Sequence, residues 1–415
     1  MRLMVVVLAL AACGGSTSHP VAHVERPADG SSVEPGSTAP PAAPAKPVSY
    51  PDPPAQAPPT GTWRVTLEFP RLQGQPAGII ADATGIYLAG GVLTADDMRS
   101  RRWAVAKLDP AAGAIAWSSV EELPRSPAPE RIALAGGGLI VAGQDESHGG
   151  TRLLRIERRE VESGKRTWQR SFTARDPKCT STDCAGKDTF GGMAVHASSV
   201  LYSATVDKPI EEAFGELSLA KGAPTKSYES RSDLRAHDIA ADDAGLYLVE
   251  DTLSNVVTLV KMTDGKTAWK QTITSNASRV AIAQPGVVLW GKTIEMRAAD
   301  TGAVAWTSNL AGEHLDVAVD DSGVYATVMI DAKPGPYFAV AKLDASSGAV
   351  QWVRRTSEHD QHRPSTNIAL DKDWLYLFGI DDGKWFVERR RKSDGALGDV
   401  PTTARTVESS AKKRR

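Results

Sequence analysis

The sequence lacks an apolar run of transmembrane length, an excess of one charge and a recognisable catalytic motif, and it has only three cysteines. Its formal net charge is −2, which gives no electrostatic reason to expect nucleic-acid binding. A Ser-His-Asp site is not indicated, because no nucleophile elbow or equivalent is present. We therefore predict no catalytic residue, no cofactor and no nucleic-acid partner.

The N-terminus has the pattern of an export signal. Arg2 precedes an apolar run from Leu3 to Leu10, far shorter than the roughly 20 residues of a membrane-spanning helix. The segment ending at Cys13, Leu-Ala-Ala-Cys, resembles the bacterial lipobox, in which the cysteine becomes the lipidated mature N-terminus. An ordinary signal peptide with an incidental cysteine is the alternative. We predict a signal peptide over residues 1–12, lipidation of Cys13 and anchoring in the cell envelope, and Gly14 favours the outer membrane, facing the periplasm or the cell surface.

The other two cysteines, Cys179 and Cys184, lie in a polar segment. Export to an oxidising compartment favours a disulfide between them. A metal site is the alternative, although no histidine or second cysteine pair stands at a ligand spacing. We predict the disulfide, which would stabilise the fold by about 2 kcal/mol at most because the loop it closes is short.

Both ends of the chain differ in composition from its middle. Residues 19–60 hold nearly half of the 26 prolines and no aliphatic periodicity, so they cannot bury enough apolar surface to fold. We predict a disordered tether over residues 13–60 and a disordered basic tail over residues 402–415. Contact of that tail with anionic lipid or polymer is the alternative to simple solvation. Residues 61–401 remain as the folded domain.

A nine-residue pattern recurs seven times in this domain. Its third and fifth positions are apolar in every copy, and its fourth position is alanine in six of the seven. Such alternation predicts a strand, and the recurring small residue predicts that each strand is the innermost one around a propeller axis. The copies are Ala77–Gly85, Glu130–Gly138, Gly191–Ser199, His237–Gly245, Ser278–Gly286, Leu315–Gly323 and Thr366–Trp374.

Each copy continues through a tight turn into a second strand, and a Gly-x-x-x-Trp pattern then marks a third and fourth strand in five repeats. The third repeat is degenerate around Gly222, and the seventh ends near Gly395 without a tryptophan. A strand containing Trp63 stands at the start with no blade before it. We therefore predict an all-β, seven-bladed propeller of four-stranded blades, closed by this N-terminal strand.

The D-x-x-x-G-x-x-x-W pattern of Asp109–Trp117 and Asp344–Trp352 resembles the docking repeat of quinoprotein-like (PQQ-like) propellers. The resemblance implies one of two classes, both usually eight-bladed: pyrroloquinoline-quinone dehydrogenases, or envelope scaffolds such as the propeller lipoprotein of the outer-membrane barrel-assembly machine. The dehydrogenases use a vicinal disulfide and a Glu/Asn/Asp calcium site, and neither is matched here. No catalytic residue or cofactor is therefore carried over.

The segments entering the innermost strands of a propeller meet at one mouth of its channel. The residues just before the apolar alternation would form a ring there, which either holds a polar ligand or neutralises its own charges. The ring consists of Gly78, Arg131, Gly192, Asp238, Arg279, Asp316 and Asn367, of which all but the two glycines are candidate binding residues. We also expect recognition loops at residues 90–102, 144–151, 173–191 and 331–336.

His359 and His362 lie three residues apart beside carboxylates and could bind zinc or nickel. Their segment has no apolar anchors, so a mobile surface loop is favoured and no metal is predicted. The function expected is a tethered, monomeric binding or scaffolding module for a protein or an envelope polymer. The alternatives are a quinoprotein-like oxidoreductase, a metal-dependent propeller hydrolase, or a structural or sensory domain.

Overall fold

The structure is a computed structural model, and it describes residues 61–407 apart from 70–71, 95–96, 122–127, 149–150, 175, 177, 179–187, 207–209, 229–230, 276, 332–334, 357–366 and 398–401. All of these described residues belong to the second of two units, Pro47–Arg415. The lipidation, disulfide and metal predictions concern Cys13, Cys179, Cys184, His359 and His362, which lie outside the described residues, as do residues 1–60. Within the described ranges, no helix is long and apolar enough to cross a membrane.

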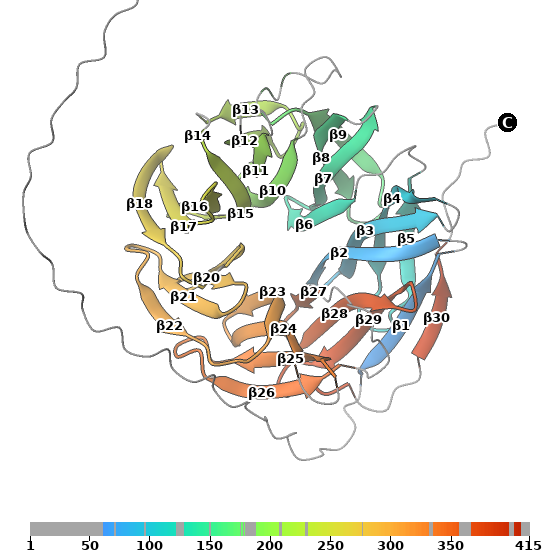
Figure 1. Ribbon diagram of the computed structural model, residues 1–415. Helices are drawn as coiled ribbons and strands as arrows, with labels where there is room; N and C mark the ends of the chain where they lie inside the picture. Colours follow the sequence, from blue (N-terminus) through green and yellow to red (C-terminus); the bar gives the residue numbers. More distant parts are fainter. Residues whose placement is uncertain are drawn as a thin grey trace, which may run out of the picture. The chain divides into compact units, whose positions relative to one another are not determined.

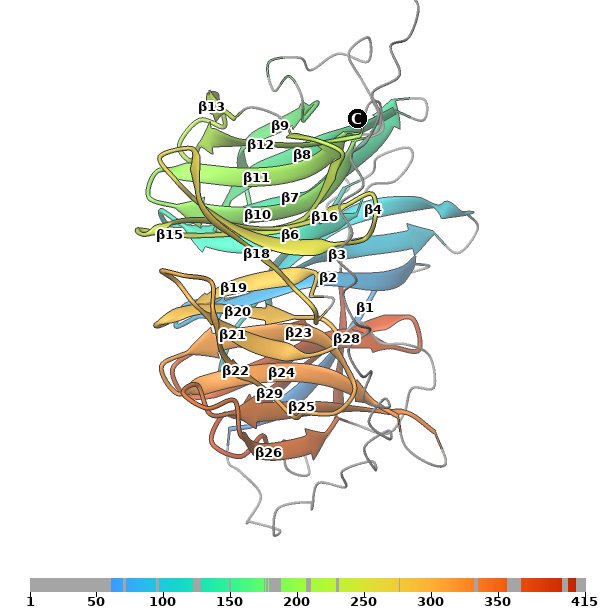
Figure 2. The same ribbon diagram turned by 60° about the vertical axis from the view of Figure 1, so that its left-hand side comes forward.

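Seven sheets surround a single axis, which confirms the predicted seven-bladed propeller (Figure 1). In Figure 2 the two neighbouring blades that contain β15–β18 and β19–β22 come toward the viewer. We number the blades in chain order from the first complete one. Blade 1 consists of β2 (Leu72–Asp82), β3 (Gly85–Thr94), β4 (Asp97–Leu108) and β5 (Ile115–Val120), and blade 2 of β6 (Pro129–Ala135), β7 (Gly138–His148), β8 (Thr151–Glu160) and β9 (Arg166–Phe172).

The remaining blades follow the same plan with small variations. Blade 3 consists of β10 (Thr189–His196), β11 (Ser199–Val206), β12 (Glu211–Ser218) and the short β13 (Pro224–Ser227) and β14 (Arg231–Ser232), which both pair with β12. Blade 4 holds β15 (Leu234–Asp242), β16 (Gly245–Thr252), β17 (Val257–Thr263) and β18 (Lys266–Thr272). Blade 5 holds β19 (Arg279–Ala283), β20 (Gly286–Trp290), β21 (Ile294–Ala298) and β22 (Val304–Thr307). Blade 6 holds β23 (Glu313–Asp320), β24 (Gly323–Ile330), β25 (Tyr337–Leu343) and β26 (Val350–Arg355), and blade 7 holds β27 (Asn367–Leu370), β28 (Trp374–Asp381), β29 (Lys384–Arg391), β1 (Trp63–Glu68) and β30 (Thr402–Thr406).

The seven-fold sequence pattern marks the innermost strand of every blade, as predicted. These strands form a ring in which each contacts the next, and β27 contacts β2 to close it. The alanines at the fourth position lie in the apolar clusters between blades: Ala240 and Ala369 are buried there and Ala281 and Ala318 are partly buried. A small side chain at this position lets the inner strands converge on the axis.

The N-terminal strand closes the ring, also as predicted. β1 pairs antiparallel with β29, from Trp63 opposite Arg389 to Leu67 opposite Trp385. A fifth strand, β30, pairs in parallel with β1, and Val407 after it is buried in the core cluster of blades 7 and 1. Residues 402–406 therefore form a strand where the sequence analysis placed the start of a disordered tail. Their polar sequence carries no apolar alternation, and backbone pairing with β1 holds them.

Two of the predicted recognition loops are largely strand. Residues 90–102 belong mostly to β3 and β4, and residues 144–151 mostly to β7 and β8, which leaves only short connections at their ends. These two hairpins are longer than those between the second and third strands of the other blades, so regular backbone pairing replaces the irregular loops that the polar sequence suggested.

The glycine–tryptophan pattern joins each blade to the next one. A glycine in the turn after the third strand has φ between +63° and +77° in all seven blades, and an aromatic side chain on, or directly after, the fourth strand of the preceding blade lies against it. Five of the tryptophans also donate their indole N–H to a backbone carbonyl of that turn. Trp63 on β1 lies against Gly113, so the closing strand docks like the others, whereas Tyr228 takes the place of tryptophan in the degenerate third repeat.

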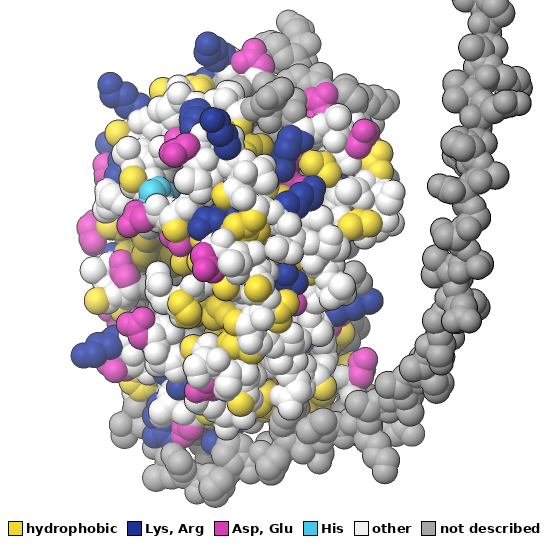
Figure 3. Space-filling view, turned by 90° about the vertical axis from the view of Figure 1, so that its left-hand side faces the viewer, with side chains coloured by type: hydrophobic (Ala, Val, Ile, Leu, Met, Phe, Trp, Pro, Cys, Tyr) yellow, Lys and Arg dark blue, Asp and Glu magenta, His cyan; other side chains and the backbone are white. Residues whose placement is uncertain are grey.

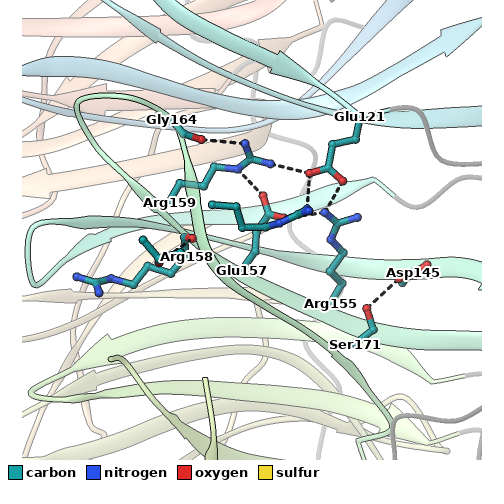
Figure 4. A network of polar contacts seen from close by, with 10 residues as sticks. Glu121, Asp145, Arg155, Glu157, Arg158, Arg159, Gly164 and Ser171 are labelled. Atoms are coloured by element: carbon teal, nitrogen blue, oxygen red, sulfur yellow. Dashed lines mark hydrogen bonds and ion pairs between the residues drawn. The ribbon is translucent and has the colours of Figure 1, made fainter. Parts of the chain in front are cut away.

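Buried ion pairs reinforce the contact between blades 1 and 2 (Figure 4). The Glu157 carboxylate on β8 accepts hydrogen bonds from Arg155 and Arg159, and Glu121 after β5 accepts from both arginines as well. Burial alone would raise the pKa of Glu157, but Arg159 and Arg155 outweigh it and hold that pKa below its ordinary value. Because Arg159 also donates to the carbonyl of Gly164, this network fixes the docking turn of blade 2.

Candidate functional site

The two ends of the propeller have different kinds of connection. At one end, the turns between the first and second strands are only two or three residues long, and the turns after the third strands are the docking turns. At the other end, the inner strands begin, and the longer connections between blades meet there. We call this end the mouth.

The predicted ring lies at the mouth. Its five candidate binding residues line one cavity of about 240 Å³, which we call the channel cavity: Arg131, Asp238, Arg279, Asp316 and Asn367. Gly78 lines the same cavity. The structure therefore brings the candidate residues together from five blades, and their role in binding a ligand stays a prediction.

A bulge precedes the ring position in five blades. The register of the inner strand shifts at Pro76/Gly78, Pro129/Arg131, Phe190/Gly192, Ala236/Asp238 and His314/Asp316. A bulge inserts one unpaired residue and bends the strand, which re-aims the side chains beside it. The skipped residues, among them Glu130 and His237, line the cavities at the mouth together with the ring residues.

An ion pair crosses the ring above blade 3. Arg131 on blade 2 contacts Asp238 on blade 4, with Nη2 and Oδ1 3.2 Å apart. The ring residue of the intervening blade is Gly192, where a Cβ would lie 2.4 Å from the same Asp238 oxygen. The missing side chain at Gly192 therefore gives the space in which Arg131 and Asp238 meet, so this glycine belongs to the ring although it contributes no side chain.

The two ring aspartates also connect neighbouring blades. Asp238 accepts a hydrogen bond from the backbone N–H of Val280, and Asp316 accepts one from the N–H of Ile368, in each case on the next inner strand. Burial raises the pKa of Asp238, with Arg131 opposing the change. Burial likewise raises the pKa of Asp316 to about 6, against the backbone N–H groups that favour its charged form. Both aspartates thus have structural partners, and Arg279 is the ring cation left without one among the described residues.

A larger cavity of about 450 Å³ adjoins the ring, and we call it the mouth cavity. Its lining comes from blades 2 to 5, and it shares Glu130 and Arg279 with the channel cavity. Arg235 and His237 on β15 line it from blade 4. The sequence analysis did not select Arg235, which lies three residues before the ring position and just outside the nine-residue pattern of its repeat. The signal that could have found it is its place two residues before His237.

Other surfaces show fewer features that indicate a site. On the side of the propeller seen in Figure 3, basic and acidic side chains are interspersed, with no large patch of one sign. In the part of the chain that the structure describes, no group of three or more histidine, cysteine, aspartate or glutamate side chains is placed to hold a metal ion.

Comparison with known proteins gives one family. The model of the family described as "Outer membrane protein assembly factor BamB" matches residues 62–271 and 253–390. Among solved structures, BamB from Moraxella catarrhalis is 16% identical over 80% of this chain and 99% of that chain, with a TM-score of 0.42. No match was found among curated proteins.

Proposed function

Because the chain belongs to the family described as outer membrane protein assembly factor BamB, we propose that it is a binding or scaffolding module for a protein in outer-membrane assembly. It acts in the cell envelope, held at the outer membrane by a lipid on Cys13 and facing the periplasm. The mouth is the face that engages the partner. If the ligand were an envelope polymer and not a protein, this proposal would be wrong.

The difference between the two ends of the propeller supports the choice of face. At the end away from the mouth, tight turns and docking glycines join the blades, and Trp117 against Gly164 is one such contact. Residues engaged in holding the ring together cannot also adapt to a partner. The mouth instead carries two adjoining cavities and the longer connections, which are the usual place for recognition on a rigid scaffold.

The test is to delete the gene for this chain in the bacterium that encodes it and to measure the amount of folded β-barrel protein in the outer membrane. We expect a reduced content of folded barrels, restored by the full chain and not by a Cys13→Ser variant that cannot be lipidated. Crosslinking in intact cells followed by purification of the full chain should recover a component of barrel assembly. An unchanged barrel content together with quinone-dependent dye reduction by the purified protein would overturn the proposal in favour of an oxidoreductase.

A further inference from the structure

Several deeply buried arginines in the described ranges are paired with carboxylates. Arg155, Arg297 and Arg390 are nearly or fully buried, and each forms an ion pair with a glutamate two residues away on its own strand. At the mouth, Arg131 follows this pattern through its contact with Asp238.

Arg235 and Arg279 are the exceptions at the mouth. Both are partly exposed and line the mouth cavity, and neither guanidinium group makes a hydrogen bond, ion pair or ring contact with another residue in the described ranges. They come from neighbouring blades, Arg235 on β15 and Arg279 at the start of β19. Glu130 is the one carboxylate among the residues that line this cavity, so the lining carries two guanidinium groups against one negative charge.

The rest of the lining fits a ligand with a polar end and a small apolar body. Thr189 and Ser278 add hydroxyl groups, and Phe190 contributes an apolar wall. The volume of about 450 Å³ lies within the range of roughly 300–1,000 Å³ typical of small-ligand sites, whereas the channel cavity is smaller. The mouth cavity can therefore receive a side chain together with part of its backbone.

The channel cavity limits where in the mouth cavity a negatively charged group can bind favourably. Arg279 lines both cavities, and beyond it lie the carboxyl groups of Asp238 and Asp316. An anion that reached past Arg279 would approach these acidic groups, while one that stayed in the mouth cavity would meet Arg235. The favourable position for a negative group is thus between the two unpaired arginines, where planar guanidinium groups match a carboxylate with two hydrogen bonds each.

We propose that the mouth cavity is a carboxylate-binding site in which Arg235 and Arg279 hold an acidic side chain of an extended segment of the partner protein. This inference rests on the proposed function, because a protein partner is what supplies such a segment. The same chemistry could come from a free small dicarboxylate, so the experiment compares the two sources.

The probe is an acetylated, amidated pentapeptide with two aspartates set between glycines, titrated into the purified full chain by calorimetry at low ionic strength. The matched peptide carries asparagine in place of aspartate, and succinate represents a free dicarboxylate. We expect binding of the aspartate peptide only, weakened as salt is added. Arg235→Gln and Arg279→Gln should each weaken it about tenfold or more, because each removes charge-assisted hydrogen bonds. Lys165→Gln, a change at an exposed lysine on the opposite face, should alter affinity less than twofold.

Four results would overturn the inference. Equal binding of the asparagine peptide would show that charge is not recognised, and unchanged binding in both arginine variants with an unchanged melting temperature would place the site elsewhere. Tighter binding of succinate than of the peptide would assign the cavity to a free dicarboxylate. If the peptide does not bind but loss of the chain still lowers barrel content, only this inference fails. If the peptide binds and barrel content is unchanged, the proposed function fails and the carboxylate site remains.

Discussion

Replacing Gly164 by alanine tests how the blades are held together. The glycine has φ +67°, and a Cβ there would lie 2.5 Å from Cε3 of Trp117 on the preceding blade. Placing an L-residue in the left-handed region costs about 1–2 kcal/mol. The methyl group must also displace the indole, which loses its hydrogen bond to the carbonyl of Val161, worth about 1 kcal/mol, and part of its packing, worth about 1–2 kcal/mol. The total loss of stability is about 3–5 kcal/mol.

Two other glycines serve as matched controls. Gly137 has φ +68°, and no atom lies within 4 Å of the position that an alanine methyl group would take, so Gly137→Ala should lose only the backbone contribution of about 1–2 kcal/mol. Gly265 is the docking glycine of blade 4, and the degenerate third repeat presents Tyr228 to it instead of a tryptophan. The nearest atom of Tyr228 is 3.5 Å away from the added Cβ, so Gly265→Ala should resemble Gly137→Ala.

The assay is urea unfolding of the purified protein, followed by tryptophan fluorescence and by far-ultraviolet circular dichroism. The expected order of destabilisation is Gly164→Ala well above Gly265→Ala and Gly137→Ala. Equal losses at all three positions would mean that only the backbone matters, and would refute the docking role assigned to the tryptophan.

Three further predictions concern other parts of the fold. Burial, together with the neighbouring Glu250 carboxylate, raises the pKa of Glu212 to about 8 despite Arg231. Since the unfolded carboxyl titrates near 4.5, the folding stability should fall as pH rises from about 5 to 8. Glu212→Gln should remove this decline and gain on the order of 2 kcal/mol in urea unfolding at pH 8. Gly192→Ala should push Asp238 away from its ion pair and cost about 2 kcal/mol, a loss that should shrink in an Asp238→Ala background. Trp385→Ala should cost about 3–5 kcal/mol, because this fully buried ring packs edge-on against Phe69 and Phe378; a loss below about 1 kcal/mol would contradict its place in the core.

The architecture was predictable because its signals are local and repeated. The apolar alternation and the central alanine of each inner strand lie within nine residues, and Trp63 at the start matched the tryptophan missing after Gly395. The ring residues could be selected for the same reason, since their position is counted from that alternation. β30 could not be predicted, because a polar strand held by backbone pairing leaves no pattern in its side chains.

The fine structure of the mouth depends on contacts between distant repeats. The approach of Arg131 to Asp238 requires the empty space at Gly192, and no single repeat contains all three residues. The mouth cavity likewise needs Arg235 and Arg279 from neighbouring blades, and the sequence does not distinguish the bulge beside Arg235 from ordinary strand. Such contacts depend on the closure of the ring, so they can be found only once the three-dimensional structure is known.

Photo-crosslinking in intact cells tests most directly whether the mouth is the binding face. Leu253 and Lys266 are both exposed and lie near opposite ends of β17 in blade 4, Leu253 toward the mouth and Lys266 toward the docking turns. With a photoreactive amino acid at either position of the otherwise unchanged chain, we predict a discrete crosslinked product with a barrel-assembly protein from position 253 and none from position 266. The same product from position 266 alone would contradict the account.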